Sequence, residues 1–220
     1  MLRFRSFSIA SQRISRSKRE NYRERSLRER ERERDYMSAY IFLDVDGVLL
    51  PFPRDEEGDK IEFPDKCLKA LCKILDDVKN AKIVLSSTWR CDPVAIKILL
   101  SEFRRFGEKD EGKVLRKIDS IDLITNPAMH TVRQHEIVEF VKRNLHENDA
   151  WIALDDDESV GSDMKFKHIT KDRYVETESD KGLTMENAMT AVRLLRSQLN
   201  STEKNKSSDR RKKKRRRKKK

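Results

Sequence analysis

The segment YIFLDVDGVLLP, residues 40–51, joins an apolar run to two closely spaced acids. Four residues suited to a buried strand lead directly into Asp44, and Asp46 and Gly47 follow one and two positions after Val45. A charge at the edge of a protein core is costly unless a partner or a cation compensates it. The segment therefore predicts a strand whose end carries a charged functional site.

Two later runs have the same form, KIVL before Ser86 and WIAL before Asp155. Short apolar runs of this kind are typical of parallel strands that helices cover on both faces. Amphipathic patterns predict helices over residues 64–78, 92–107, 133–145 and 184–199. The alternation predicts a single α/β domain with a Rossmann-like parallel sheet flanked by helices. Ligands bind at the carboxyl ends of such strands, so the polar residues there should converge.

Charge divides the chain into three parts. Residues 1–38 carry a net charge of +6, and residues 197–220 carry +11. Because the whole chain has a net charge of +11, residues 39–196 carry −6. The predicted domains are an Arg/Ser/Glu-rich disordered arm at 1–37, a catalytic core at 38–200 and a disordered Lys/Arg tail at 201–220.

The basic tails indicate partners and location. Lysine and arginine clusters bind RNA or DNA by releasing counterions from phosphates, and they also serve as import signals, which predicts a nuclear or cytoplasmic protein. The first nineteen residues hold six basic and no acidic side chains, so a mitochondrial location is the alternative. No apolar run approaches the roughly 20 residues of a membrane span, so no membrane partner is expected. Nothing in the sequence indicates an oligomeric state.

Acids gathered at one sheet edge predict a metal site. Asp44, Asp46, Asp155 and Asp156 would repel one another without a cation. Carboxylate oxygens suit Mg²⁺, which is commonly held by one or two carboxylates together with substrate phosphate. A phosphorylated substrate is therefore expected.

These residues resemble the motifs of the haloacid dehalogenase (HAD) superfamily. DVDGVL resembles motif I, Ser86 in KIVLSS resembles motif II, and Asp155 and Asp156 in WIALDD resemble the acidic motif IV. Arg133 in HTVRQHEIVEF is the best match for the basic residue of motif III. The resemblance covers residues 39–196 and is similar to the small HAD domains associated with RNA-repair polyproteins.

The resemblance implies a Mg²⁺-dependent phosphomonoester hydrolase, acting on nucleotides or nucleic-acid ends. Asp44 would attack phosphorus and form an aspartyl phosphate. Asp46 would protonate the leaving oxygen and then deprotonate the attacking water. Ser86 and Arg133 would hold the phosphoryl oxygens.

The resemblance also implies the metal ligands. Asp44, Asp155 and the main-chain carbonyl of Asp46 would hold Mg²⁺. Asp156 would be a further ligand or would orient Arg133.

Several assignments stay open on the sequence alone. Ser87 could supply the motif II hydroxyl in place of Ser86, and it is a candidate for substrate binding. Motif III more often carries Lys than Arg, so Lys142 and Lys165 are fallbacks for Arg133.

Two residues directly after motif II are candidates for substrate contact. Trp89 could equally be core packing, and Arg90 could equally form a surface ion pair. The sequence does not decide between these roles.

No large cap domain is expected. The insertions at 51–63 and 107–120 are too short to fold separately, so the site should be open and suited to a large or polymeric substrate. The rival hypothesis is a nucleic-acid-binding or scaffold protein with an inactive core. A mutase would need a cap to exclude water, and a protein phosphatase is disfavoured because Val48 stands where the DxDxT pattern has Thr.

Overall fold

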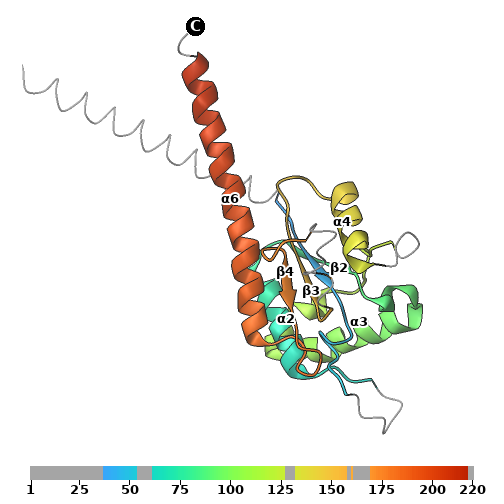
Figure 1. The fold of residues 1–220 in the computed structure, drawn as a ribbon. Coiled ribbons are helices and arrows are strands. Elements are labelled where there is room, and N and C mark those ends of the chain that lie inside the picture. Colours follow the sequence, from blue (N-terminus) through green and yellow to red (C-terminus); the bar gives the residue numbers. More distant parts are fainter. Residues whose placement is uncertain (1–36, 54–60, 127–131, 158–159, 161–168, 218–220) are drawn as a thin grey trace, which may run out of the picture. The chain divides into compact units, whose positions relative to one another are not determined.

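The computed structural model describes residues 37–53, 61–126, 132–157, 160 and 169–217, with side chains described up to Ser201. By contacts the chain divides into Met1–Met37 and Ser38–Lys220, and the fold below is that of the second unit. Its elements, in chain order, are β1 (Ala39–Leu43), α2 (Asp65–Asp77), β2 (Ala81–Leu85), η1 (Thr88–Cys91), α3 (Pro93–Gly107), η2 (Asp110–Gly112), η3 (Leu115–Lys117), α4 (Arg133–Asn144), β3 (Ala150–Asp155), β4 (Tyr174–Glu176) and α6 (Met185–Arg217) (Figure 1).

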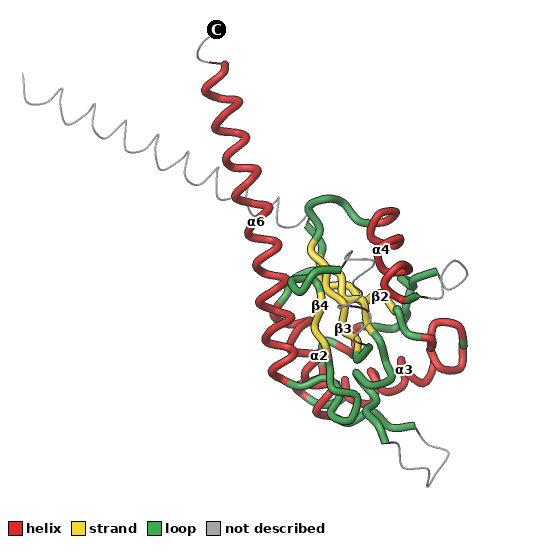
Figure 2. The backbone as a smooth tube through the Cα atoms, in the orientation of Figure 1, coloured by secondary structure: helices red, strands yellow, loops and turns green. Residues whose placement is uncertain are grey.

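The four strands form one parallel sheet in the order β2-β1-β3-β4 (Figure 2). Leu43 at the end of β1 pairs with Leu85 of β2 and with Leu154 of β3, so these strands end level with one another. The segment after η3 extends the sheet beyond β2 through an isolated bridge between Leu85 and Ile124. The parallel sheet predicted from the three apolar runs is confirmed, and β4 is an additional strand.

Successive residues of β1 serve opposite faces of the sheet. Ile41 and Leu43 belong to a core cluster that also takes residues from α2, α3 and α6, whereas Phe42 belongs to a second cluster with Ile137 of α4. Phe42 contacts Trp151 of β3 edge to face, with 5.7 Å between ring centroids. Because both faces are covered, the buried residues of β1 and β3 are almost all apolar, as is typical of parallel sheets. The α/β fold class is confirmed.

The helix limits follow the local sequence signals. Asp92 caps α3 by accepting a hydrogen bond from the main-chain N–H of Val94 at 2.8 Å, with Pro93 in the first turn. Gly107 is the last residue of α3, as predicted. The helix predicted from Pro64 begins one residue later, at Asp65, so Pro64 precedes the first turn of α2.

Near the middle of its length, helix α6 is hydrogen-bonded to strand β3 of the sheet. Gln198 accepts a hydrogen bond from the main-chain N–H of Trp151 at 2.9 Å and donates to the carbonyl oxygen of the same residue at 3.1 Å. The α6 backbone is described as helical to Arg217, and the disorder predicted for residues 201–220 stays a prediction. Lys and Arg are good helix formers, and no Gly or Pro interrupts the run. The predicted domain boundaries, including the arm at 1–37, stay predictions.

Within the described part of the chain, no helix combines the length and apolarity that a bilayer crossing needs.

Candidate active site

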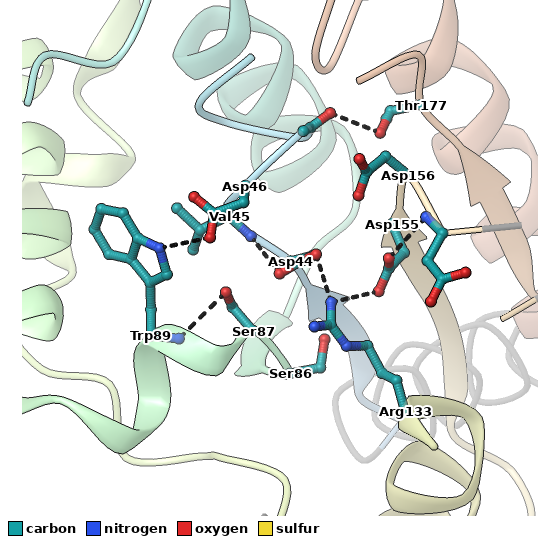
Figure 3. A network of polar contacts seen from close by, with 12 residues as sticks. Asp44, Val45, Asp46, Ser86, Ser87, Trp89, Arg133, Asp155, Asp156 and Thr177 are labelled. Carbon is teal, nitrogen blue, oxygen red and sulfur yellow. Dashed lines mark hydrogen bonds and ion pairs between the residues drawn. The ribbon is translucent and has the colours of Figure 1, made fainter. Parts of the chain in front are cut away.

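The residues at the carboxyl ends of β1, β2 and β3 lie at one edge of the sheet. Asp44 follows β1, Ser86 follows β2, and Asp155 is the last residue of β3. The ladder continues through these positions, since the N–H of Asp44 donates to Leu154 and the N–H of Ser86 donates to Leu43, both at 3.0 Å. The predicted convergence is therefore present in the structure (Figure 3).

Asp44, Asp155 and Asp156 form a compact carboxylate group. One oxygen from each lies within 4.8 Å of the other two. Asp44 and Asp155 are buried, with 5% and 1% of their surface exposed, and Asp156 is half-buried. Main-chain N–H groups orient two of them: Val45 donates to Oδ1 of Asp44 at 2.8 Å, and Asp157 donates to Oδ1 of Asp155 at 3.1 Å.

Arg133 lies between two of these carboxylates. It is the first residue of α4, and its Nη1 contacts Oδ2 of Asp44 and lies 2.9 Å from Oδ2 of Asp155. A single guanidinium nitrogen thus joins the ends of β1 and β3 (Figure 3).

The electrostatics of this group favour a cation. The pKa of Asp155 is raised to about 7, mainly by burial and also by the charge of Asp44, while Arg133 acts in the opposite direction. Burial lowers the pKa of Arg133, but the charges of Asp155 and Asp44 outweigh this, and the pKa is raised above its usual value. When all three carboxylates are ionised, their charge exceeds that of the one guanidinium by two, which a divalent cation would neutralise.

The turn after β1 holds Asp156 in place. Gly47 has a φ of +70°, and a Cβ added there would lie 2.1 Å from Oδ2 of Asp156. Thr177 donates to the carbonyl oxygen of Gly47 at 3.0 Å, and Ser179 donates to Oδ2 of Asp156 at 2.6 Å. Only glycine allows this approach without strain.

The two candidate serines have different surroundings. The hydroxyl oxygen of Ser86 is buried and has no hydrogen-bond partner among the described residues. Ser87 caps η1, with 3.4 Å between its Oγ and the main-chain nitrogen of Trp89. Because Ser87 only accepts in this contact, its O–H is also a possible donor, and both serines stay candidates for the motif II hydroxyl.

Residues 40–188 match the family described as the HAD domain in Swiss Army Knife RNA repair proteins. The chain belongs to this HAD family. No curated protein and no solved structure was found to match it. Membership of the HAD family implies a hydrolase of the phosphatase type.

The carboxylate group of this HAD domain fits the metal that such domains generally use. All three donors are carboxylate oxygens, which suit a hard cation such as Mg²⁺, and their spacing allows one ion to contact all of them. Asp44, Asp155 and Asp156 are the residues that would hold it.

The side chain of Asp46 lies outside the group of three carboxylates. Its Oδ2 accepts a hydrogen bond from the indole Nε1 of Trp89 at 3.0 Å. Figure 3 shows this side chain turned toward Trp89. A metal contact through the main-chain carbonyl of Asp46 stays a prediction.

The surroundings of Arg90 do not fit the substrate contact considered for it from the sequence. Its guanidinium is buried, donates to the carbonyl oxygens of Ser86 and Ser87 at 2.7 and 2.6 Å, and pairs with Glu136 at 2.6 Å. These contacts direct the guanidinium into the protein interior, where Arg90 stabilises the segment after β2. The sequence showed the arginine but not Glu136, its partner from α4.

The fallbacks for motif III lie elsewhere. Lys142 is exposed and nine residues further along α4 than Arg133, which corresponds to roughly 13 Å of helix. Lys165 lies outside the described residues. Sequence reasoning missed Thr177 and Ser179, which carry no motif and come after a three-residue strand.

Proposed function

We propose that the protein is a Mg²⁺-dependent phosphomonoester hydrolase that forms an aspartyl phosphate on Asp44. The observation that carries this proposal is the position of Arg133, with one nitrogen in contact with both Asp44 and Asp155 at the strand ends. A buried carboxylate held beside a cationic donor suits a nucleophile that must accept a phosphoryl group with several negative charges.

In the first half-reaction Asp44 supplies the nucleophilic oxygen. The bond from this oxygen to phosphorus forms while the bond from phosphorus to the leaving oxygen breaks, and Asp46 gives that oxygen a proton. In the second half-reaction water attacks the same phosphorus, passes its proton to Asp46 and releases Asp44 with inorganic phosphate. Ser86 and Arg133 are proposed to hold the non-bridging oxygens in both steps.

Bound Mg²⁺ would neutralise charge on the phosphoryl group and on the carboxylates. The N–H groups of Val45 and Asp157 keep Asp44 and Asp155 oriented without it. Ser179 does the same for Asp156.

The nucleophile can be tested with the full-length protein and an aryl phosphate. Asp44→Asn keeps the shape of the side chain but removes the nucleophilic charge, and we expect no turnover above background with Mg²⁺ present. Asp119→Asn is the matched control, because Asp119 is an exposed carboxylate outside the site, and this variant should retain wild-type activity. Equal activity in wild type and Asp44→Asn would end the proposal.

The substrate is proposed to be large, such as the phosphorylated end of a nucleic acid. Among the described residues no second domain is inserted between the elements that carry the site. The basic segment at 201–220 is proposed to bind RNA or DNA phosphates, which would make binding strongly salt-dependent. A nuclear location through the same segment stays a prediction.

Two measurements distinguish the proposed function from the rival hypothesis, a nucleic-acid-binding or scaffold protein with an inactive core. Removal of residues 201–220 should abolish salt-sensitive RNA binding and leave hydrolysis of a small aryl phosphate unchanged. RNA binding with no phosphatase activity in the intact protein would favour the rival.

A further inference from the structure

Trp89 contacts the proposed acid–base residue directly. Its indole N–H donates to Oδ2 of Asp46, with 3.0 Å between nitrogen and oxygen (Figure 3). The two residues are 43 positions apart, so the contact depends on the fold and not on local sequence. Nothing in the motifs of the domain assigns a role to this indole.

The ring of Trp89 is held rigidly. It is 8% exposed and packs edge to face against Phe63, with 5.6 Å between ring centroids. Trp89 lies in η1, and the next residue is Arg90, whose buried guanidinium is fixed to Glu136 and to the carbonyl oxygens before η1. A donor on such a support has little freedom to move, so it constrains its acceptor.

We propose that Trp89 is a positioning residue that holds the carboxylate of Asp46 for proton transfer to the leaving group. This inference rests on the proposed phosphatase function. The hydrogen bond fixes the position of Oδ2 of Asp46 relative to the buried ring of Trp89. The indole also limits rotation of the carboxylate, which general acid catalysis requires to be well aligned.

The test uses a series of aryl phosphates whose phenols differ in acidity. A poor leaving group needs the proton from Asp46 while the phosphorus–oxygen bond breaks, but a strongly acidic phenol does not. The quantity to measure is kcat/KM, because it covers the steps up to formation of the aspartyl phosphate.

Trp89→Phe keeps an aromatic ring beside Phe63 and removes only the N–H donor. We expect kcat/KM to fall at least about tenfold for phenyl phosphate and less than about threefold for 4-nitrophenyl phosphate, since general acids contribute roughly 10²–10⁴ in rate. Trp151→Phe is the matched control, because this indole lies in the other core cluster, and its profile should follow wild type. An equal fall across all phenols would show a merely structural role and overturn the proposal.

A second measurement does not depend on the folding of a Trp89 variant. The chain has two tryptophans, so Trp151→Phe leaves Trp89 as the only source of an indole N–H signal in a ¹H–¹⁵N spectrum. Asp46→Asn in that background should move the signal upfield, because a neutral amide is a weaker acceptor than a carboxylate. An unmoved signal would exclude the contact. Absence of activity in wild type would instead reject the phosphatase function and leave this spectroscopic result standing.

Discussion

The guanidinium of Arg90 and the carboxylate of Glu136 form an ion pair inside the protein. Nη2 lies 2.6 Å from Oε2, and the two side chains are 5% and 6% exposed. Arg90 comes from the segment after β2, whereas Glu136 lies in the first turn of α4, three residues after Arg133. The pair therefore ties the segment that carries Ser86 to the helix that supplies Arg133.

Breaking this pair should strongly destabilise the fold. Arg90→Met removes the charge that compensates buried Glu136, and loss of one partner of a buried pair costs about 3–5 kcal/mol. Urea unfolding followed by circular dichroism would measure the change. Lys73→Ala is the control, because its ion pair with Asp77 is partly exposed to solvent and should contribute about 1 kcal/mol or less. Similar stability of the two variants would contradict the prediction, and Glu136→Leu added to Arg90→Met should restore part of the loss.

Gly47→Ala should damage both stability and metal binding. A left-handed backbone costs a residue with a side chain about 1–2 kcal/mol, and the added Cβ would displace Asp156 from its contact with Ser179. We expect a lower melting temperature and weaker Mg²⁺ binding by titration calorimetry.

The two effects at Gly47 can be separated. Gly47→Asn adopts a left-handed backbone more easily than alanine but still adds a Cβ, so it should recover stability without recovering Mg²⁺ affinity. Unchanged Mg²⁺ affinity in both variants would show that Asp156 does not contribute to the metal site.

The three cysteines should differ in reactivity toward an alkylating reagent. The pKa of the Cys72 thiol is raised to about 12, mainly by burial and also by the charge of Asp76, and burial also raises the pKa of Cys67. Cys91 is exposed. Because the thiolate is the reactive form, native protein at neutral pH should be alkylated once and denatured protein three times, as counted by mass spectrometry. Cys91→Ser should abolish the native reaction, and rapid modification of a second cysteine would contradict the burial of α2.

The sequence predicted the elements with strong local signals. The runs before Asp44, Ser86 and Asp155 are apolar except for Lys82, and polar residues suited to catalysis follow at the strand ends, so both the sheet and the convergence could be inferred. β4 was missed because its three residues, Tyr174–Glu176, are too few to form an apolar run.

The contacts that orient the site could not be predicted in this way. Trp89 reaches Asp46 across 43 positions, and Arg90 reaches Glu136 across 46. Such pairs depend on how α4 and η1 pack against the sheet. The sequence around Trp89 and Arg90 therefore does not indicate their partners. The sequence therefore left Arg90 between a substrate contact and a surface ion pair, whereas its charge is neutralised by Glu136 inside the protein.

Arg133 and Lys142 can be separated as candidates for the phosphate-binding cation. Arg133→Met should lower kcat/KM by about 10²–10³, because it removes a preorganised donor beside the reacting group. Arg133→Lys should retain more activity, since one nitrogen makes both contacts with Asp44 and Asp155 and an ammonium supplies a comparable charge. Lys142→Met should match wild type, because Lys142 is exposed further along α4. Thermal melts of all three variants would exclude unfolding as the cause. The opposite order, with activity lost in Lys142→Met and kept in Arg133→Met, would remove Arg133 from the site and leave the carboxylates without their assigned partner.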